Sequence, residues 1–275
     1  WWSAARDGCR TAVILGARLR AGAKEYDLPS QFFNAADREH CSTSLWHNGR
    51  GRLIWLNNLA PQGDWSTAPV MRSFSDDNGV TWEQPKMVLP QVRAGQPAHM
   101  VMFRGADGAI YQPADYWITD EEKTGDCGAT ALYRSRDEGD SWKEVTRIDH
   151  QIENLAKDGQ TAGAIAGPHG VAVDLKDGSL LGIGRRATID GNLIFSRSKD
   201  GGASWTYSRS PFPKIKFCQR PSMLRLKEGP ILFIAYTSEL TQPGHSKIAP
   251  VPSEAGDVEL AVNYQGWTFL DANDQ

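Results

Sequence analysis

The stretch Ser75–Trp82, with the sequence SDDNGVTW, decides the fold because its pattern occurs three times along the chain. Ser135–Trp142 reads SRDEGDSW and Ser198–Trp205 reads SKDGGASW, so all three share the form S-x-D-x-G-x-[ST]-W. Successive copies begin roughly sixty residues apart. Self-similarity at such a period indicates one supersecondary unit that is used repeatedly.

The repeated octet has the composition of a tight turn between two strands. A short Asp side chain accepts hydrogen bonds from turn amides, Gly adopts the positive φ that such turns need, and Trp packs beneath the turn. Asp107-Gly108, Asp177-Gly178 and Glu228-Gly229 each join two apolar runs, which indicates β-hairpins. One repeat therefore reads strand, turn, strand, loop, strand, octet, strand, which is the pattern of a four-stranded antiparallel propeller blade.

The octet resembles the Asp-box of the sialidase (neuraminidase) superfamily, also called the BNR repeat, and the resemblance covers most of the chain. It implies an all-β fold, a single β-propeller domain over 1–275 with Asp-box turns, at least four to five blades visible and six if complete. In that family the box is structural and lies away from the active site. The repeats are expected at about 38–90, 97–150, 166–212 and 218–270, with 1–37 as a partial blade or closing segment.

The composition is that of an ordinary globular protein, with a formal net charge of −3 over 275 residues. This charge argues against nucleic acid as the main partner, because phosphate binding needs a dense basic face. No apolar run is long enough for a membrane span. Trp1–Ser3 does not read as a signal peptide, and we interpret the chain as a mature or trimmed product. We expect a monomer that is secreted, periplasmic or lysosome-like.

The cysteines argue against a zinc site because they are widely spaced and form no C-x-x-C pair. They are Cys9, Cys41, Cys127 and Cys218. We expect no metal ion and no cofactor. Disulfides and buried free thiols are both open interpretations.

Polar residues recur at one structural position when the repeats are aligned on their hairpins. The starts of the first strands carry His40, His99, His169 and Arg220. The ends of the second strands carry Asp115 with Tyr116, Arg185 with Arg186, and Tyr236. The first strand of a propeller blade lines the central axis, so we expect these side chains to converge at one end of it, opposite the octets.

The closest local match to sialidases runs from Gly167 to Trp205 and continues at Phe217-Cys218-Gln219. On this match, Arg185 or Arg186 takes the place of the middle arginine of the family's carboxylate-binding triad. Asp64 falls near the family's acid/base aspartate. The chain departs from the family elsewhere: Arg38–Cys41 replaces the Arg-Ile-Pro motif, and no arginine follows Arg225.

We expect a carbohydrate-active enzyme of the sialidase superfamily, an exo-acting glycoside hydrolase, with a polysaccharide lyase and a glycan-binding propeller as alternatives. All three have an acidic oligo- or polysaccharide as the partner. An exo-acting glycoside hydrolase needs an acid and a nucleophile or base, roles open to Asp64, Asp115, Tyr116 and Tyr236. A polysaccharide lyase needs a base and a cation on the carboxylate. For the lyase, the base is His99 or His169, the cation is Arg185 or Arg220, and the acid is Tyr116 or Tyr236. The third class is a non-catalytic glycan-binding propeller.

Overall fold

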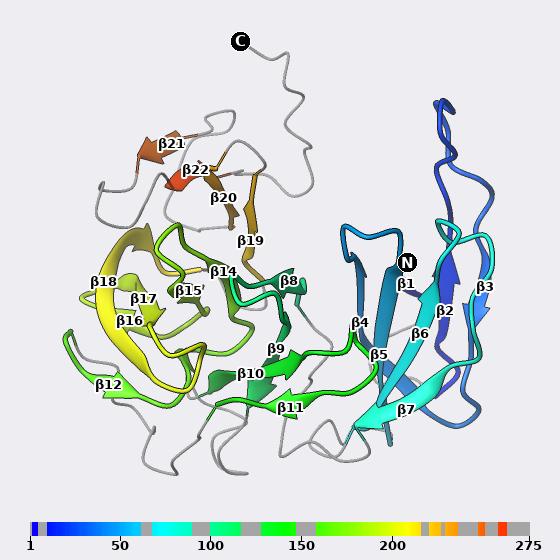
Figure 1. Cartoon of the computed structure of the whole chain (residues 1–275), viewed down its shortest axis with the longest axis horizontal. Coiled ribbons are helices and arrows are strands. Elements are labelled where there is room, and N and C mark those ends of the chain that lie inside the picture. The colour runs from blue at the N-terminus through cyan, green and yellow to red at the C-terminus, as the bar shows by residue number, and fades with distance from the viewer. Residues whose placement is uncertain are drawn as a thin grey trace. The chain divides into compact units, whose positions relative to one another are not determined.

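The computed structural model describes residues 2–4, 10–61, 68–89, 100–116, 128–146, 158–215, 220–226, 229–235, 247–250 and 258–262. The regular structure in these ranges consists of β-strands, with no helix among them, so the chain is all-β as predicted (Figure 1). Within the same ranges, no helix is therefore long and apolar enough to cross a membrane.

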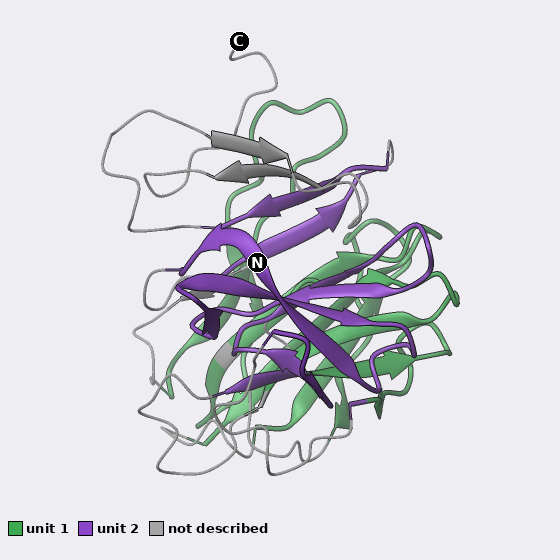
Figure 2. Ribbon diagram, turned by 90° about the vertical axis from the view of Figure 1, so that its left-hand side faces the viewer, with its two compact units in different colours: residues 1–123, 131–145 green, residues 124–130, 146–275 purple. Residues whose placement is uncertain are grey.

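The chain divides into two compact units, residues 1–123 with 131–145 and residues 124–130 with 146–275 (Figure 2). The described strands of the first unit form the sheets β1-β2-β3, β4-β5-β6-β7 and β8-β9-β10-β11. Their bounds are β1 Trp2–Ala4, β2 Val13–Gly16, β3 Ser30–Phe33, β4 Glu39–His47, β5 Leu53–Ala60, β6 Val70–Ser75, β7 Lys86–Leu89, β8 Phe103–Arg104, β9 Ile110–Tyr116, β10 Ala129–Ser135 and β11 Lys143–Glu144.

The second unit contains the first two residues of β10, which pair with β13, and two further sheets. One sheet has the order β12-β18-β17-β15-β14 with β16 paired to β17, and the other has the order β19-β20-β22-β21. The bounds are β12 Thr161–Ala162, β13 Ile165–Ala166, β14 Val171–Asp174, β15 Leu180–Ile183, β16 Thr188–Ile189, β17 Asn192–Ser198, β18 Trp205–Pro213, β19 Ser222–Arg225, β20 Ile231–Ile234, β21 Lys247–Pro250 and β22 Val258–Val262.

The hairpins predicted from Asp-Gly and Glu-Gly are confirmed, since β8 pairs with β9, β14 with β15 and β19 with β20, all antiparallel. Two details of the blade prediction are wrong. The short strands β12, β13 and β16 bring two sheets above four strands, because segments outside the hairpins also pair. In the last sheet β22 runs parallel to β20, because it returns from β21 into the place between β21 and β20.

The three octets share one turn conformation. In each, the Ser hydroxyl donates to the Asp carboxylate at 2.8 Å and accepts the Gly amide at 2.8 Å. The seventh residue donates its amide to the same carboxylate at 2.9 Å and its hydroxyl at 2.5 to 2.6 Å. Side-chain and backbone hydrogen bonds from Thr81 lower the pKa of Asp77 to about 2. The Asp therefore serves the turn, as its pattern predicts.

The tryptophans of the octets differ in burial. Trp142 and Trp205 are 9% and 0% exposed, and each donates its indole N–H to the carbonyl of the octet glycine at 3.1 Å. Trp82 is only half-buried, so it packs less completely beneath its turn than the other two tryptophans. It packs edge-to-face on Phe32 and, with Leu28, lines a cavity of about 620 Å³ beside the three-stranded first sheet.

Candidate functional site

The end of the β14–β15 hairpin carries three of the predicted site residues. Val171 pairs with Ile183, so the residues before β14 and after β15 lie at the same end of the sheet. His169 precedes this pair by two positions and Arg185 follows it by two. The amide of Arg185 donates to the carbonyl of Pro168 at 2.9 Å, which continues the pairing beyond the strands.

His169 and Arg185 contact each other. Nη2 of Arg185 lies 3.5 Å from Nε2 of His169, and the residues are 4% (Arg185) and 7% (His169) exposed. A guanidinium only donates, so as a hydrogen bond this contact makes Nε2 the acceptor and leaves the ring proton on Nδ1. At this length the bond is weak, and a carboxylate is a stronger partner for the guanidinium. The pair therefore combines a buried cation with a ring that can exchange protons.

The backbone around this pair is strained. His169 and Arg186 have φ values of +52° and +70°. This left-handed conformation costs a residue with a side chain about 1–2 kcal/mol. The amide of Ala187 donates to the carbonyl of Arg185 at 2.9 Å and closes a tight turn around Arg186. Gly184 permits the close approach, since a Cβ there would lie 2.2 Å from the carbonyl oxygen of Ala166. Such strain concentrates at functional sites, which makes this hairpin end the candidate site.

His40 lies in quite different surroundings, inside the first unit at the start of β4. The residue is 3% exposed, Nε2 accepts the amide of Ala35 at 3.2 Å, and Nδ1 lies 3.1 Å from Nδ2 of Asn57. The ring also meets Phe33 edge-to-face at 5.4 Å. Burial lowers the pKa of His40 to about 4, so the ring is neutral at pH 7. These are the contacts of a core residue, and substrate binding by His40 stays a prediction that they do not favour.

The other predicted residues are placed separately or not described. Asp115 is 1% exposed at the end of β9, and Arg220 is exposed before β19. The side chain of Tyr116 lies outside the described part, as do Asp64, His99 and Tyr236. The structure thus brings His169 next to Arg185, with Arg186 adjacent in the chain, and the convergence of the remaining residues stays a prediction. Within the described ranges, no three His, Cys, Asp or Glu side chains are grouped as metal ligands.

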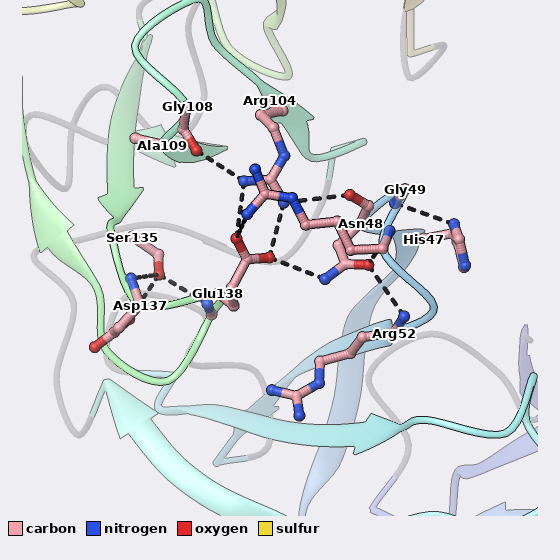
Figure 3. Close-up of polar contacts among 12 residues, drawn as sticks. His47, Asn48, Gly49, Arg52, Arg104, Gly108, Ala109, Ser135, Asp137 and Glu138 are labelled. Carbon is pink, nitrogen blue, oxygen red and sulfur yellow. Dashed lines mark hydrogen bonds and ion pairs between the residues drawn. The ribbon is translucent and has the colours of Figure 1, made fainter.

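A charged cluster that the sequence analysis did not single out surrounds Glu138, in the second octet (Figure 3). Its carboxylate accepts hydrogen bonds from Arg104 at 2.8 and 3.0 Å, from Arg50 at 2.8 Å and from Asn48 at 2.9 Å. Arg104, the strongest influence, and then Asn48 hold the pKa of Glu138 below its usual range. Glu138 fills a variable position of the octet, so the repeat contained no signal for it. Here the protein supplies its own carboxylate to its arginines, which indicates a structural cluster.

The strands and the common hydrogen bonding of the three octets define the class as an all-β repeat protein. More particularly, the chain belongs to the family of BNR repeat-like domains, whose sequence model matches residues 1–244.

Solved structures share this fold at low sequence identity. A protein of unknown function from Dyadobacter fermentans has a TM-score of 0.61 at 15% identity, over 94% of this chain and 74% of that one. The Trypanosoma rangeli sialidase has a TM-score of 0.53 at 14% identity, over 82% of this chain and 39% of that one. The Ruminococcus gnavus intramolecular trans-sialidase has a TM-score of 0.53 at 12% identity, over 76% and 66%. At such identities the likeness establishes the fold alone, and the chain spans less than two thirds of either sialidase.

Proposed function

We propose that this protein is a carbohydrate-active enzyme of the sialidase superfamily, an exo-acting glycoside hydrolase that cleaves acidic glycans. The observation that carries the proposal is the buried guanidinium of Arg185 in contact with His169, at the strand ends of a BNR repeat protein. The planar donor fork of Arg matches a carboxylate in geometry and charge. A sugar carboxylate that enters the site would take these donors and offset the cost of burying the cation.

The related folds support an acidic substrate. The Trypanosoma rangeli sialidase is described in complex with 2,3-difluorosialic acid as a covalent intermediate, and the Ruminococcus gnavus trans-sialidase with oseltamivir carboxylate. Both ligands are carboxylic acids by name. An arginine that binds a carboxylate is therefore a reasonable element to expect in a chain with this fold.

In the proposed reaction Arg185 holds the carboxylate and orients the sugar ring, with Arg186 and Arg220 as further cations. Glycoside hydrolysis needs an acid for the leaving oxygen and a nucleophile or base for the anomeric carbon. Asp64 is the proposed acid/base and Tyr236 the proposed nucleophile, with His169 and His99 assisting proton transfer. Asp115 and Tyr116 are proposed to contact the substrate.

We further propose that the sheets are blades of one β-propeller domain and that the octets are its Asp-boxes. The antiparallel order β4-β5-β6-β7 supports this, with an octet between its third and fourth strands. The common hydrogen bonding of the three octets supports it too. At least four to five blades, and a secreted monomer, remain part of the proposal.

A polysaccharide lyase is the second candidate, and the contact between His169 and Arg185 favours it specifically. β-Elimination needs a base for the proton next to a carboxylate and a cation that stabilises the resulting enolate. When a uronate carboxylate takes over the donors of Arg185, Nε2 of His169 is released to accept that proton. The same two side chains would then serve elimination instead of hydrolysis.

Product analysis on a panel of acidic glycans tests the proposal, with the carboxyl-reduced form of each glycan as the matched control. Free acidic sugar, released from the chain end without the ultraviolet absorbance of an unsaturated uronate, supports the hydrolase. That absorbance together with chain cleavage would reject the hydrolase and support the lyase. Binding without cleavage would leave a glycan-binding propeller, and neither binding nor cleavage would reject all three functions.

A further inference from the structure

One buried hydroxyl forms hydrogen bonds with both ends of the segment that carries His169. Oγ1 of Thr130 donates to the carbonyl of Gly167 at 2.9 Å and accepts the amide of Gly170 at 2.7 Å. Thr130 is 0% exposed, so water does not compete for these bonds. A single side chain therefore joins both ends of the segment Gly167–Gly170.

This segment lies outside regular strand pairing, because β13 ends at Ala166 and β14 begins at Val171. Its φ values are +87° at Gly167 and +52° at His169, so two of its four residues have a left-handed backbone. Strained backbone of this kind persists only where the surroundings over-determine it. The two bonds of Thr130 are placed on either side of His169 and supply that constraint.

We propose that Thr130 is a positioning residue for the site, which holds His169 in the left-handed conformation that places its ring against Arg185. The role of the His169–Arg185 pair in catalysis rests on the proposed function, but the positioning itself does not. The neighbouring backbone has further ties that do not involve Thr130. The amide of Ala166 donates to Oγ of Ser196 at 3.0 Å, and the Arg185 amide to the Pro168 carbonyl at 2.9 Å. Loss of the hydroxyl should therefore change the site more than the sheet.

The test compares Thr130→Val, which keeps the shape but removes the hydroxyl, with the matched control Thr130→Ser, which keeps the hydroxyl. The first readout is the position of the side-chain ¹⁵N resonances of His169, assigned by their absence in His169→Gln. The second is kcat and KM on an acidic glycan that the wild type cleaves. In Thr130→Val we expect displaced His169 resonances and a kcat lower by about 10- to 100-fold, because small misplacements of catalytic groups have effects of this size. Thr130→Ser should keep the wild-type resonances and turnover.

Unchanged His169 resonances in folded Thr130→Val would overturn the positioning role. If that variant does not fold, amide hydrogen exchange at Gly170 in the wild type and in Thr130→Ser tests the hydrogen bond between this amide and the hydroxyl at position 130. Strong protection in both supports the bond to Oγ1, and exchange at the rate of an exposed amide rejects it. If the wild type cleaves no acidic glycan but Thr130→Val still displaces the resonances, the proposed function fails and the positioning role stands.

Discussion

The alignment of the hairpins in sequence gives His40 and His169 equivalent positions, and both are buried, yet their surroundings differ. His40 lies within β4, paired with Leu59, whereas His169 precedes β14. His40 is held between a backbone amide, the side chain of Asn57 and the ring of Phe33. His169 has a left-handed backbone and faces the guanidinium of Arg185. Positions that the sequence alignment makes equivalent therefore hold a core residue in one unit and a candidate site residue in the other.

The comparison shows which observations separate structural from functional histidines in this fold. Burial is common to both and does not discriminate between them. What distinguishes His169 is a buried cation as its neighbour and a strained backbone. Both features cost folding free energy, and proteins often retain them at functional sites. Substitutions at His169, His40, Arg185 and Arg186 test this distinction.

His169→Gln should lower turnover on an acidic glycan by about 10²–10⁴-fold if its ring transfers protons, the usual range for a general acid or base. His40→Gln is the matched variant, and its core contacts predict an unchanged kcat for the folded fraction. Both are compared by steady-state kinetics, with circular dichroism to establish the folded fraction. Equal losses of kcat in the two variants would remove the distinction and restore His40 to the site.

The stability of the protein should depend on pH through His40. Burial lowers the pKa of His40 from 6.5 to about 4, so between these values the unfolded chain binds a proton that the folded protein does not. The free energy of unfolding then rises with pH in this window, and the contribution is fully present above about pH 6.5. It is lost as the pH falls toward 4, by about 3 kcal/mol over the window. Urea unfolding at several pH values should show this slope in the wild type and a shallower one in His40→Gln. Parallel slopes would argue against a neutral, buried His40.

Arg185→Gln should weaken binding of a carboxylated glycan by about 1.5–3 kcal/mol, the range for a hydrogen bond to a charged group. The carboxyl-reduced glycan should lose far less affinity, because it offers no charge to the guanidinium. Titration calorimetry on both ligands measures the difference. A similar loss for the two ligands would mean that Arg185 supports the structure and does not recognise the carboxylate.

Arg186→Gly should raise the free energy of unfolding slightly, by about 0.5–1 kcal/mol. Glycine relieves the left-handed strain at φ +70° but has more backbone entropy to lose on folding. If the side chain of Arg186 also serves the site, the same variant loses affinity for the acidic glycan. Chemical unfolding and binding are measured on one preparation. A marked loss of stability would show that Arg186 contributes packing that outweighs its strain.

Much of the fold could be predicted from the sequence because its signals are local. The octets and the Asp-Gly hairpins specify turns through side chains only a few residues apart, and both are found in the structure. The prediction was wrong where neighbours along the chain do not decide the outcome. Trp82 is less buried than Trp205, although both occupy the same position of the octet, and β22 pairs parallel with β20.

The site could be predicted only as a set of positions. The hairpin register predicts His169 and Arg185 at the same end of one hairpin, and their contact agrees with this prediction. His40 is predicted at the equivalent position, where the structure has core contacts instead. Thr130 could not be predicted, since a threonine at the start of a strand is common and carries no motif.

Local sequence is enough to specify repeated β-strands with Asp-anchored turns, because the hydrogen bonds of each turn lie within eight residues. Which polar residues contact one another depends instead on tertiary packing. Thr130 and Gly170 are 40 residues apart in sequence, and His169 and Arg185 are 16 apart. Contacts over such separations depend on how strands pack and on which strained backbone the packing tolerates, and no local pattern of residue types encodes that.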